Sequence, residues 1–387
     1  MKKALLVSYG GGHINIILAV AKELSKYLDV TILGLTNAKM KALNAGFKTR
    51  TFYDYANDDE IKLGMEYKHF HVEGNSFDLQ DTIAYYGVNL YSLIEEVGKT
   101  KAISLFEEMG RSVFLPIEKF KEIFQLEKPD IVLVTNSPRS EFAALLAAKE
   151  MKIPSISIED LFGMDPGEFG SFRRINRFQI PDYICVMSDK VKLNLIERGV
   201  KKDKIIVTGQ PAFDGIRLID SSHNLIEREI LYASQPTSNT HLILATLIKI
   251  KQEGLINKIT VKLHPSQQVK EYLYIKDFGF ELIEGKADIK QLITQHQVIL
   301  TEYSTVGLEA VFLNRALVTV NLSSESKLVP YEQLGLSYNA DDLIELKSVI
   351  LEAIDNGPTD SAKVWNSFDT GSFEVSKLVK KVIGYTD

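Results

Sequence analysis

Polar side chains follow two apolar segments in the second half of the chain. His264-Pro265 ends VKLHPSQ, and Ser304-Thr305 separates VILTEYS from the helical pattern VGLEAVF. Both apolar segments are typical of buried parallel strands, and ligands bind beyond the carboxyl ends of such strands. Pro265 fixes its turn, His264 can donate a proton to a phosphate, and Ser304 and Thr305 can cap the helix. We predict a phosphate site here; two ordinary capped turns are the alternative.

Three further residues of the sequence suit a nucleotide. Glu309 lies one turn into the predicted helix, where an acid can accept hydrogen bonds from ribose hydroxyls. Gln235 follows the strand-like REILYA and could contact a base or a phosphate, or belong to an ordinary polar loop. Gln210, in the segment GQP, follows another strand-like segment. We expect Gln210 to line the floor between the two halves of the chain, or to belong to a hinge.

The first half opens with an apolar strand, the turn GGGH and an amphipathic helix. Gly11 and Gly12 would let a ligand approach the backbone and the first N–H groups of the helix. His13 could take a proton from a substrate hydroxyl. The spacing matches neither a dinucleotide fingerprint nor a P-loop. A tight turn that needs glycine for geometry, with a solvated histidine, is the alternative.

Two carboxylates, Glu159 and Asp160, end the strand-like segment PSISIED. At a strand's carboxyl end, Asp160 could act as a base or orient His13. A helix cap or a surface pair is the alternative. We predict His13 and Asp160 as the catalytic residues.

Repeated alternation of strand-like and helical segments must position these residues. It predicts an α/β fold with two Rossmann-like, doubly wound domains facing a cleft. We expect an N-terminal, acceptor-side domain over 1–212, with a helical insertion at about 57–128. A nucleotide-donor domain follows over 213–366. The segment 367–387 reads as a helix that packs back on the N-terminal domain.

Composition excludes several classes of protein. The chain has 387 residues, a net charge of −6 and no dense basic stretch, which argues against a nucleic-acid partner. Cys185 is the single cysteine, so a reducing, cytoplasmic location is expected. No apolar segment is long enough to span a membrane, so membrane contact would be peripheral at most. The sequence contains no CxxC, HExxH, DxD or GxSxG motif. We therefore predict no metal site and no serine hydrolase.

The motifs resemble those of GT-B glycosyltransferases over nearly the whole chain. GGGH looks like the start of their acceptor domain, and KLHPSQ with TEYSTVGLEAVFLNRALVTVNL looks like their donor domain. Bacterial sialyl-, Kdo and glycerophosphotransferases are similar in this region. The resemblance implies that His264, Ser304 and Thr305 contact the donor phosphate. VTGQPAFD also resembles a segment of the UDP-GlcNAc 2-epimerases, but their double-glycine helix start and Arg-Pro-Glu opening are absent, which favours a transferase.

The sequence therefore predicts a metal-independent glycosyltransferase of polysaccharide biosynthesis that needs no cofactor. Its donor would be a nucleotide sugar, and its acceptor a hydroxyl of a glycan, a lipid-linked molecule or a small molecule. A UDP-GlcNAc 2-epimerase-like epimerase or hydrolase is one alternative, and a non-catalytic nucleotide-sugar-binding subunit is a second. The nucleotide base, the sugar, the acceptor, the stereochemical outcome and the oligomeric state stay open.

Overall fold

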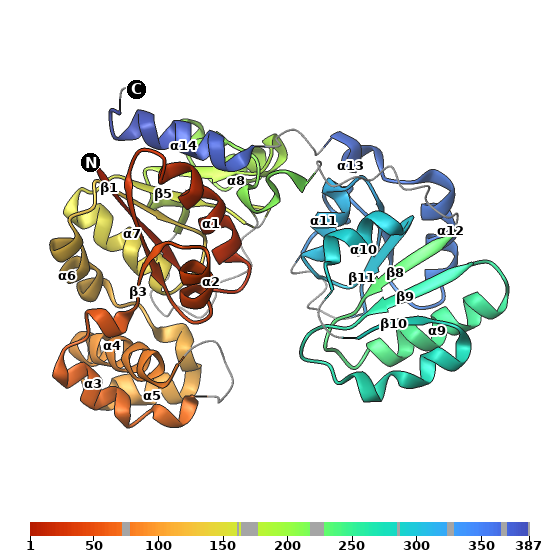
Figure 1. Cartoon of the computed structure of the whole chain (residues 1–387), viewed down its shortest axis with the longest axis horizontal. Coiled ribbons are helices and arrows are strands. Elements are labelled where there is room, and N and C mark those ends of the chain that lie inside the picture. Colours follow the sequence, from red (N-terminus) through yellow and green to blue (C-terminus); the bar gives the residue numbers. More distant parts are fainter. Residues whose placement is uncertain are drawn as a thin grey trace. The chain divides into compact units, whose positions relative to one another are not determined.

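The chain forms two compact α/β units in the computed structural model, which describes residues 1–71, 78–160, 162–163, 177–216, 228–284, 287–322, 329–364 and 370–385 (Figure 1). Unit 1 contains Met1–Asp214 and Thr370–Asp387, and unit 2 contains Gly215–Asp369. Each unit is built on one parallel sheet. The predicted fold class of two Rossmann-like α/β domains is confirmed.

Unit 1 has a seven-stranded sheet in the order β3-β2-β1-β4-β5-β6-β7, and every paired neighbour is parallel. The order reverses between β1 and β4, where doubly wound sheets bind ligands. Its strands are β1 (Lys3–Ser8), β2 (Asp29–Gly34), β3 (Lys48–Arg50), β4 (Ile131–Val134), β5 (Ser155–Ile158), β6 (Tyr183–Val186) and β7 (Ile205–Val207).

Unit 2 has a six-stranded parallel sheet in the order β10-β9-β8-β11-β12-β13, which reverses between β8 and β11. Its central strands are wholly buried, as expected of a sheet covered on both faces. The strands are β8 (Glu229–Ala233), β9 (Lys258–Lys262), β10 (Glu281–Ile283), β11 (Val298–Thr301), β12 (Ala316–Val320) and β13 (Tyr338–Ala340).

Helices connect the strands in both units. Those of unit 1 are α1 (His13–Leu24), α2 (Ala38–Asn44), α3 (Asp58–Met65), α4 (Leu79–Val97), α5 (Lys99–Met109), α6 (Ile117–Glu127), α7 (Ser140–Met151), α8 (Asp189–Glu197) and α14 (Gly371–Val382). Those of unit 2 are α9 (Thr240–Gln252), α10 (Ile289–Gln295), α11 (Val306–Phe312), α12 (Leu346–Asn356) and α13 (Asp360–Val364). The helical spacing over 268–279 predicts an α-helix, but the chain there forms the short 3₁₀ segments η8 (Val269–Glu271) and η9 (Leu273–Phe278). Tyr272 and Ile275 are both buried, and a spacing of three residues suits the 3₁₀ period.

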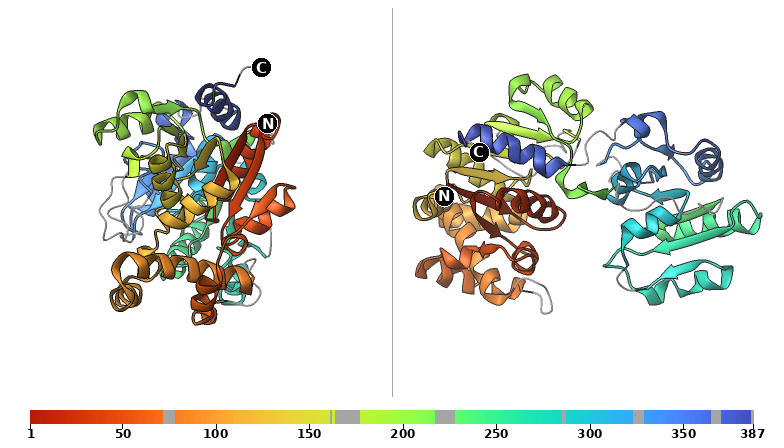
Figure 2. Two further views of the ribbon diagram at one scale, coloured as in Figure 1. Left: turned by 90° about the vertical axis from the view of Figure 1, so that its left-hand side faces the viewer. Right: turned by 45° about the horizontal axis from the view of Figure 1, so that its top comes forward.

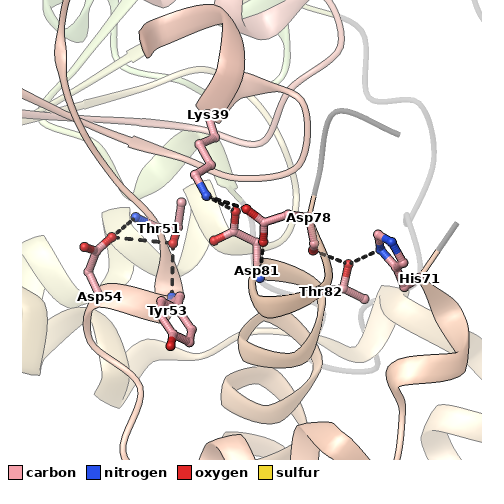
Figure 3. Close-up of polar contacts among 8 residues, drawn as sticks. All are labelled: Lys39, Thr51, Tyr53, Asp54, His71, Asp78, Asp81 and Thr82. Atoms are coloured by element: carbon pink, nitrogen blue, oxygen red, sulfur yellow. Dashed lines mark hydrogen bonds and ion pairs between the residues drawn. The ribbon is translucent and has the colours of Figure 1, made fainter. Parts of the chain in front are cut away.

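Helices α3, α4, α5 and α6 lie between β3 and β4 in the sequence, and α4 contacts α2 through a charged group. Lys39 of α2 pairs with Asp78 at 2.8 Å and with Asp81 of α4 (Figure 3). Asp81 is almost completely buried, so its charge is tolerated because Lys39 lies against it. The contact fixes the start of α4 beside α2.

Two glycines allow α3 and α4 to cross at very close range. A Cβ on Gly64 would lie 2.0 Å from the Ile83 carbonyl oxygen, and one on Gly87 would lie 1.9 Å from the Glu60 carbonyl oxygen. Neither backbone oxygen can move without separating the helices. The crossing therefore requires glycine at both positions.

We expect Gly87→Ala to lower the free energy of unfolding by about 1–3 kcal/mol, because the added methyl group must push α3 away. Urea unfolding followed by circular dichroism would measure the change. Gly12→Ala is the matched control, since Gly12 has φ −76° and no described atom lies within 4 Å of the added Cβ. An unchanged unfolding midpoint in Gly87→Ala would contradict the close crossing.

The last helix, α14, belongs to unit 1, the unit that also contains β1 (Figure 2). Its buried residues Val375, Leu378 and Val379 join the core that contains α1. Asp214 accepts hydrogen bonds from the N–H groups of Gly371 at 2.6 Å and Ser372 at 3.0 Å. The start of α14 is therefore fixed to the end of the η6 turn (Pro211–Phe213) by a partly buried carboxylate.

Candidate functional site

A histidine and an aspartate meet at the carboxyl edge of the sheet in unit 1. His13 begins α1, and its Nδ1 lies 3.1 Å from Oδ2 of Asp160, which follows β5. The same nitrogen lies 2.7 Å from Oγ1 of Thr135, directly after β4. These strand ends lie side by side because β4 pairs with both β1 and β5 in parallel register. The structure thus brings together the two residues that the sequence predicts as catalytic.

A buried glutamate supports this pair from beneath. Glu141, in the first turn of α7, is inaccessible to solvent and accepts hydrogen bonds from the N–H groups of Thr135 at 2.7 Å and Tyr9 at 2.6 Å. It also accepts from the Thr135 hydroxyl. Because that hydroxyl donates to Glu141, its oxygen is left to accept from His13 Nδ1–H. Glu141 therefore positions Thr135, and Thr135 helps to position the imidazole.

The ion pair determines the charge of His13. Burial by itself lowers the pKa of the imidazole, but the hydrogen bond and the charge of Asp160 outweigh it and raise the pKa to about 9. His13 is then an imidazolium at neutral pH, so it can donate a proton or offset a negative charge. Asp160 keeps Oδ1 buried without a hydrogen-bond partner among the described residues, which leaves a carboxylate oxygen for a ligand.

A second carboxylate, that of Glu159, follows the same strand as Asp160 and contacts two other side chains. Glu159 is buried, accepts a hydrogen bond from Asn136 Nδ2 at 2.9 Å and lies 3.4 Å from an Arg177 nitrogen. These side chains line a small pocket whose walls also include Phe142 and Phe178. The Glu159 carboxylate thus has partners, whereas Oδ1 of Asp160 has none among the described residues.

The glycine turn before α1 leaves room for a ligand. Gly10 is required by packing, because a Cβ there would lie 2.3 Å from Thr36 Oγ1 and its φ is +127°. Gly11 has φ +62° and donates to Asn37 Oδ1 at 2.9 Å. No described atom lies within 4 Å of a Cβ built on Gly11 or Gly12. The space over these two residues is therefore open, and α1 has no acidic residue in its first turn.

In unit 2, a glutamine links the ends of β8 and β9. Gln267 Oε1 accepts from the Ser234 hydroxyl at 2.6 Å and from the His264 N–H at 2.9 Å. The His264 ring is exposed, and its Nδ1 accepts from the Ser266 N–H at 3.2 Å. Nε2 is therefore left to carry the proton of the neutral ring. Pro265, also exposed, follows in the same turn.

The loop after β8 is held by a buried acid. Glu302, after β11, accepts hydrogen bonds from the Thr237 hydroxyl at 3.0 Å and from Asn239 Nδ2 at 3.4 Å. Gln235 is buried in this loop, and its carbonyl oxygen accepts from the Thr240 hydroxyl at 2.7 Å. Glu302 thus fixes the loop that carries Gln235.

Ser304 and Thr305 precede α11 and differ in their contacts. Ser304 Oγ accepts from the Val306 N–H at 3.2 Å, and its carbonyl oxygen accepts from the Tyr331 hydroxyl at 2.8 Å. Thr305 occupies the N-cap position but makes no side-chain cap, and it is exposed. Only Ser304 caps the turn, although the sequence suggests that both residues could; the Thr305 hydroxyl stays open to a ligand.

Glu309 lies within α11 and has an unusual protonation equilibrium. Burial raises the pKa of its carboxyl to about 7, while nearby Lys290 lowers it and Asp288 raises it. Oε2 is buried and has no hydrogen-bond partner among the described residues. An acceptor that lacks a donor is costly in the unliganded protein, so Glu309 is suited to bind hydroxyl groups of a ligand.

Gln210 lies in unit 1, whereas the other predicted nucleotide-contacting side chains, Gln235, His264, Ser304, Thr305 and Glu309, lie in unit 2. It is buried just before η6, and its Oε1 has no partner among the described residues. Its backbone packs against the start of α14, since a Cβ on Gly371 would lie 2.9 Å from the Gln210 carbonyl carbon.

Thr135, Glu141 and Gln267 are absent from the predicted site. One signal for Glu141 exists: helix α7 is apolar on nearly every side, so a charged residue in its first turn must be buried with partners. Thr135 and Gln267 carry no comparable signal, because threonine and glutamine are common in polar loops.

The model of the UDP-N-acetylglucosamine 2-epimerase family matches residues 101–327, which is more than half of the chain. The chain belongs to this family. An epimerase homologue from Methanococcus maripaludis is 26% identical over 233 residues, which cover 54% of this chain. The match spans 64% of that relative's length.

Solved epimerase structures share the fold. A Staphylococcus aureus MnaA–UDP structure has a TM-score of 0.64 at 16% identity and covers 100% of this chain and 98% of its own. The UDP-GlcNAc 2-epimerase of Neisseria meningitidis has a TM-score of 0.61 at 16% identity, with full coverage of both chains. At this identity the likeness establishes the fold alone.

Membership of the epimerase family corrects the function predicted from sequence. The prediction of a glycosyltransferase is wrong, and the UDP-GlcNAc 2-epimerase alternative is the better one. The absence of the double glycine and of the Arg-Pro-Glu motif does not exclude membership of the epimerase family. The predicted role of the His-Pro turn and the hydroxyl pair is to contact a phosphate, which the substrates of both kinds of enzyme contain, so these motifs do not distinguish the two.

Two features are absent from the described part of the chain. No group of three or more His, Cys, Asp or Glu side chains is arranged there to hold a metal ion. No helix in these segments is long and apolar enough to cross a membrane.

Proposed function

We propose that the chain is a nucleotide-sugar 2-epimerase whose substrate is a UDP-linked 2-acetamido sugar. The observation that carries the proposal is the His13–Asp160 pair, at the strand ends of unit 1, in a chain of this family. A related structure is described as bound to UDP-GlcNAc and another to UDP, which supports the choice of nucleotide.

The chemistry of carbon 2 explains why such a site is suitable. The C2–H bond of a glycosyl nucleotide has no neighbouring carbonyl, so it is not acidic in the intact substrate. When the C1–O bond to the diphosphate breaks, positive charge develops at C1 and makes the C2 proton removable. A base then takes that proton. A proton donated from an acid on the opposite face then adds to C2, and renewed bonding of UDP or attack of water at C1 gives the 2-epimer.

Asp160 and His13 supply the groups that this chemistry needs. Asp160, with its open Oδ1, is the proposed base that removes the C2 proton. His13 is protonated at neutral pH and is the proposed acid, a role opposite to the base predicted from sequence. Its positive charge offsets negative charge that develops on the departing oxygen.

Unit 2 supplies the proposed nucleotide contacts. His264, Ser304 and Thr305 would contact the diphosphate, and Glu309 would accept from the ribose hydroxyls. Gln235 would contact the base or a phosphate. In unit 1, the open space over Gly11 and Gly12 would accommodate the substrate next to the first N–H groups of α1, and Gln210 would contribute its unpartnered oxygen.

A single NMR time course tests the proposal. Purified protein is incubated with UDP-GlcNAc, without any acceptor, and the anomeric proton signals are followed. We expect the 2-epimer to appear, either as UDP-ManNAc or as free ManNAc with UDP. His13→Gln should slow the conversion by about 10²-fold or more. An unchanged spectrum, with UDP binding shown separately by calorimetry, would contradict the proposed activity on this substrate.

A further inference from the structure

Two arginines from different elements contact one tyrosine in unit 1. Tyr9 follows β1, and its hydroxyl accepts a hydrogen bond from Arg111 at 3.1 Å. The guanidinium carbon of Arg139 lies 4.3 Å from the centroid of the same ring. Arg111 belongs to the 3₁₀ turn η3 (Gly110–Val113), and Arg139 directly precedes α7. A single aromatic ring therefore separates two positive charges.

Neither arginine has an ion-pair partner in the part of the chain that the structure describes. Within the described residues, no carboxylate forms an ion pair with Arg111 or Arg139, whereas Arg50 and Arg177 of the same unit each have one. Arg139 also keeps its Nε buried without an acceptor in this part of the chain. The buried, unpartnered donor of Arg139 costs free energy, which an anion that contacts it would offset.

The arginines are linked to the proposed reaction centre by a buried residue. Glu141 accepts from the Tyr9 N–H and also holds Thr135, which contacts His13. Glu141 accepts these bonds from neutral donors, and no ion pair joins it to Arg139 within the described residues. A single residue, Glu141, therefore contacts both Tyr9, beside the two arginines, and Thr135, beside His13.

The charge of the substrate determines what these arginines would bind. This step rests on the proposed function, which assigns the diphosphate to His264, Ser304 and Thr305. UDP-N-acetylglucosamine has no negative charge other than that of its diphosphate. The planar fork of a guanidinium group matches a carboxylate, and a sugar whose C6 is oxidised carries one.

We propose that Arg111, Arg139 and Tyr9 form a carboxylate site, and that the substrate is a UDP-linked N-acetylated uronic acid. Arg139 supplies its unpartnered Nε–H, Arg111 adds a second guanidinium, and Tyr9 holds the two at a fixed separation. The site determines specificity and takes no part in proton transfer.

Calorimetry with three probes tests the site: UDP, UDP-N-acetylglucosamine and UDP-N-acetylglucosaminuronic acid. We expect the intact protein to bind the uronic acid at least tenfold tighter than UDP-N-acetylglucosamine. Arg111→Gln and Arg139→Gln should each weaken binding of the uronic acid by about tenfold, the usual effect of a lost charge-assisted hydrogen bond, and leave UDP binding within twofold. Arg139→Lys, which keeps the charge but loses the fork, should recover only part of the loss. Arg50→Gln, which removes an exposed arginine of the same unit, should change nothing.

Two results would overturn the proposal. In the first, the intact protein does not prefer the uronic acid. In the second, the glutamine variants weaken all three probes equally, which would show that the arginines bind the diphosphate. Melting curves of each variant identify a folding defect, and the Arg139→Lys protein then provides the decisive comparison. An NMR time course with both sugars separates this result from the proposed function: an arginine-dependent preference without epimerisation supports the site and contradicts the activity.

Discussion

Asp160→Asn is expected to slow epimerisation by about 10²- to 10⁴-fold, the range for loss of a general base. The same change should lower the pKa of His13 from about 9, although the charges of Glu141 and Glu159 continue to raise it. Burial, which lowers this pKa, stays in the variant, whereas the hydrogen bond and charge of Asp160, which raise it, are removed. The NMR time course measures the rate, and a histidine titration by NMR measures the pKa.

The stability of the protein should change with the same ionisation. The folded state holds the His13 proton more tightly than the unfolded state, so the stabilisation is complete below pH 6.5 and is lost as the pH rises to about 9. A shift of this size corresponds to about 3 kcal/mol at most. Asp160→Asn should reduce this loss between pH 6.5 and 9. Glu118→Gln, at an exposed carboxylate of unit 1, is the control. If Asp160→Asn epimerises at the original rate and its His13 titrates as in the original protein, Asp160 is neither the base nor the cause of the raised His13 pKa.

Affinity for UDP is expected to rise about tenfold between pH 6 and pH 8 through Glu309. Its carboxyl pKa of about 7 means that most molecules are protonated at pH 6 and ionised at pH 8, and the carboxylate is the better acceptor for ribose hydroxyls. Calorimetry at several pH values would show the change, with proton release on binding. In Glu309→Gln the affinity should be weaker and should not depend on pH over this range.

The same residue should cost stability in the unliganded protein. Because its folded-state pKa is raised from 4.5 to about 7, the free energy of unfolding falls as the pH rises through this window. Glu309→Gln should therefore match the original protein near pH 4.5 and exceed it by about 3 kcal/mol at pH 8. Urea unfolding at both pH values gives the comparison. Equal stability at pH 8 would show that Glu309 has a donor in solution.

Periodicity was sufficient to predict the two parallel sheets, because buried strands and amphipathic helices alternate along most of the chain outside the helical segment between β3 and β4. It failed at η8 and η9, where the 3₁₀ turns share the apolar spacing of an α-helix. It also could not show the close crossing at Gly64 and Gly87, since a helical glycine has no distinct meaning until its neighbour is known.

The sequence predicts that His13 and Asp160 follow strands, but it does not predict the neighbouring residues on which their chemistry depends. The charge of His13 follows from its distance to Asp160, and its orientation follows from Thr135 and Glu141, over 120 residues away. The choice between transferase and epimerase failed for a different reason. The predicted phosphate site at His264 and Ser304 concerns the leaving group alone, whereas the kind of reaction depends on which group removes a proton and from where.

The docking of α14 has a consequence for biosynthesis. The core that contains α1 includes Val375, Leu378 and Val379, so it stays incomplete until the ribosome has made the chain through residue 382. The whole of unit 2 is synthesised between Asp214 and Thr370, the residues at which the chain leaves and re-enters unit 1. Unit 2 can therefore finish folding first, although unit 1 begins at the N-terminus. Until α14 arrives, the apolar surface of α1 is one that a chaperone could cover.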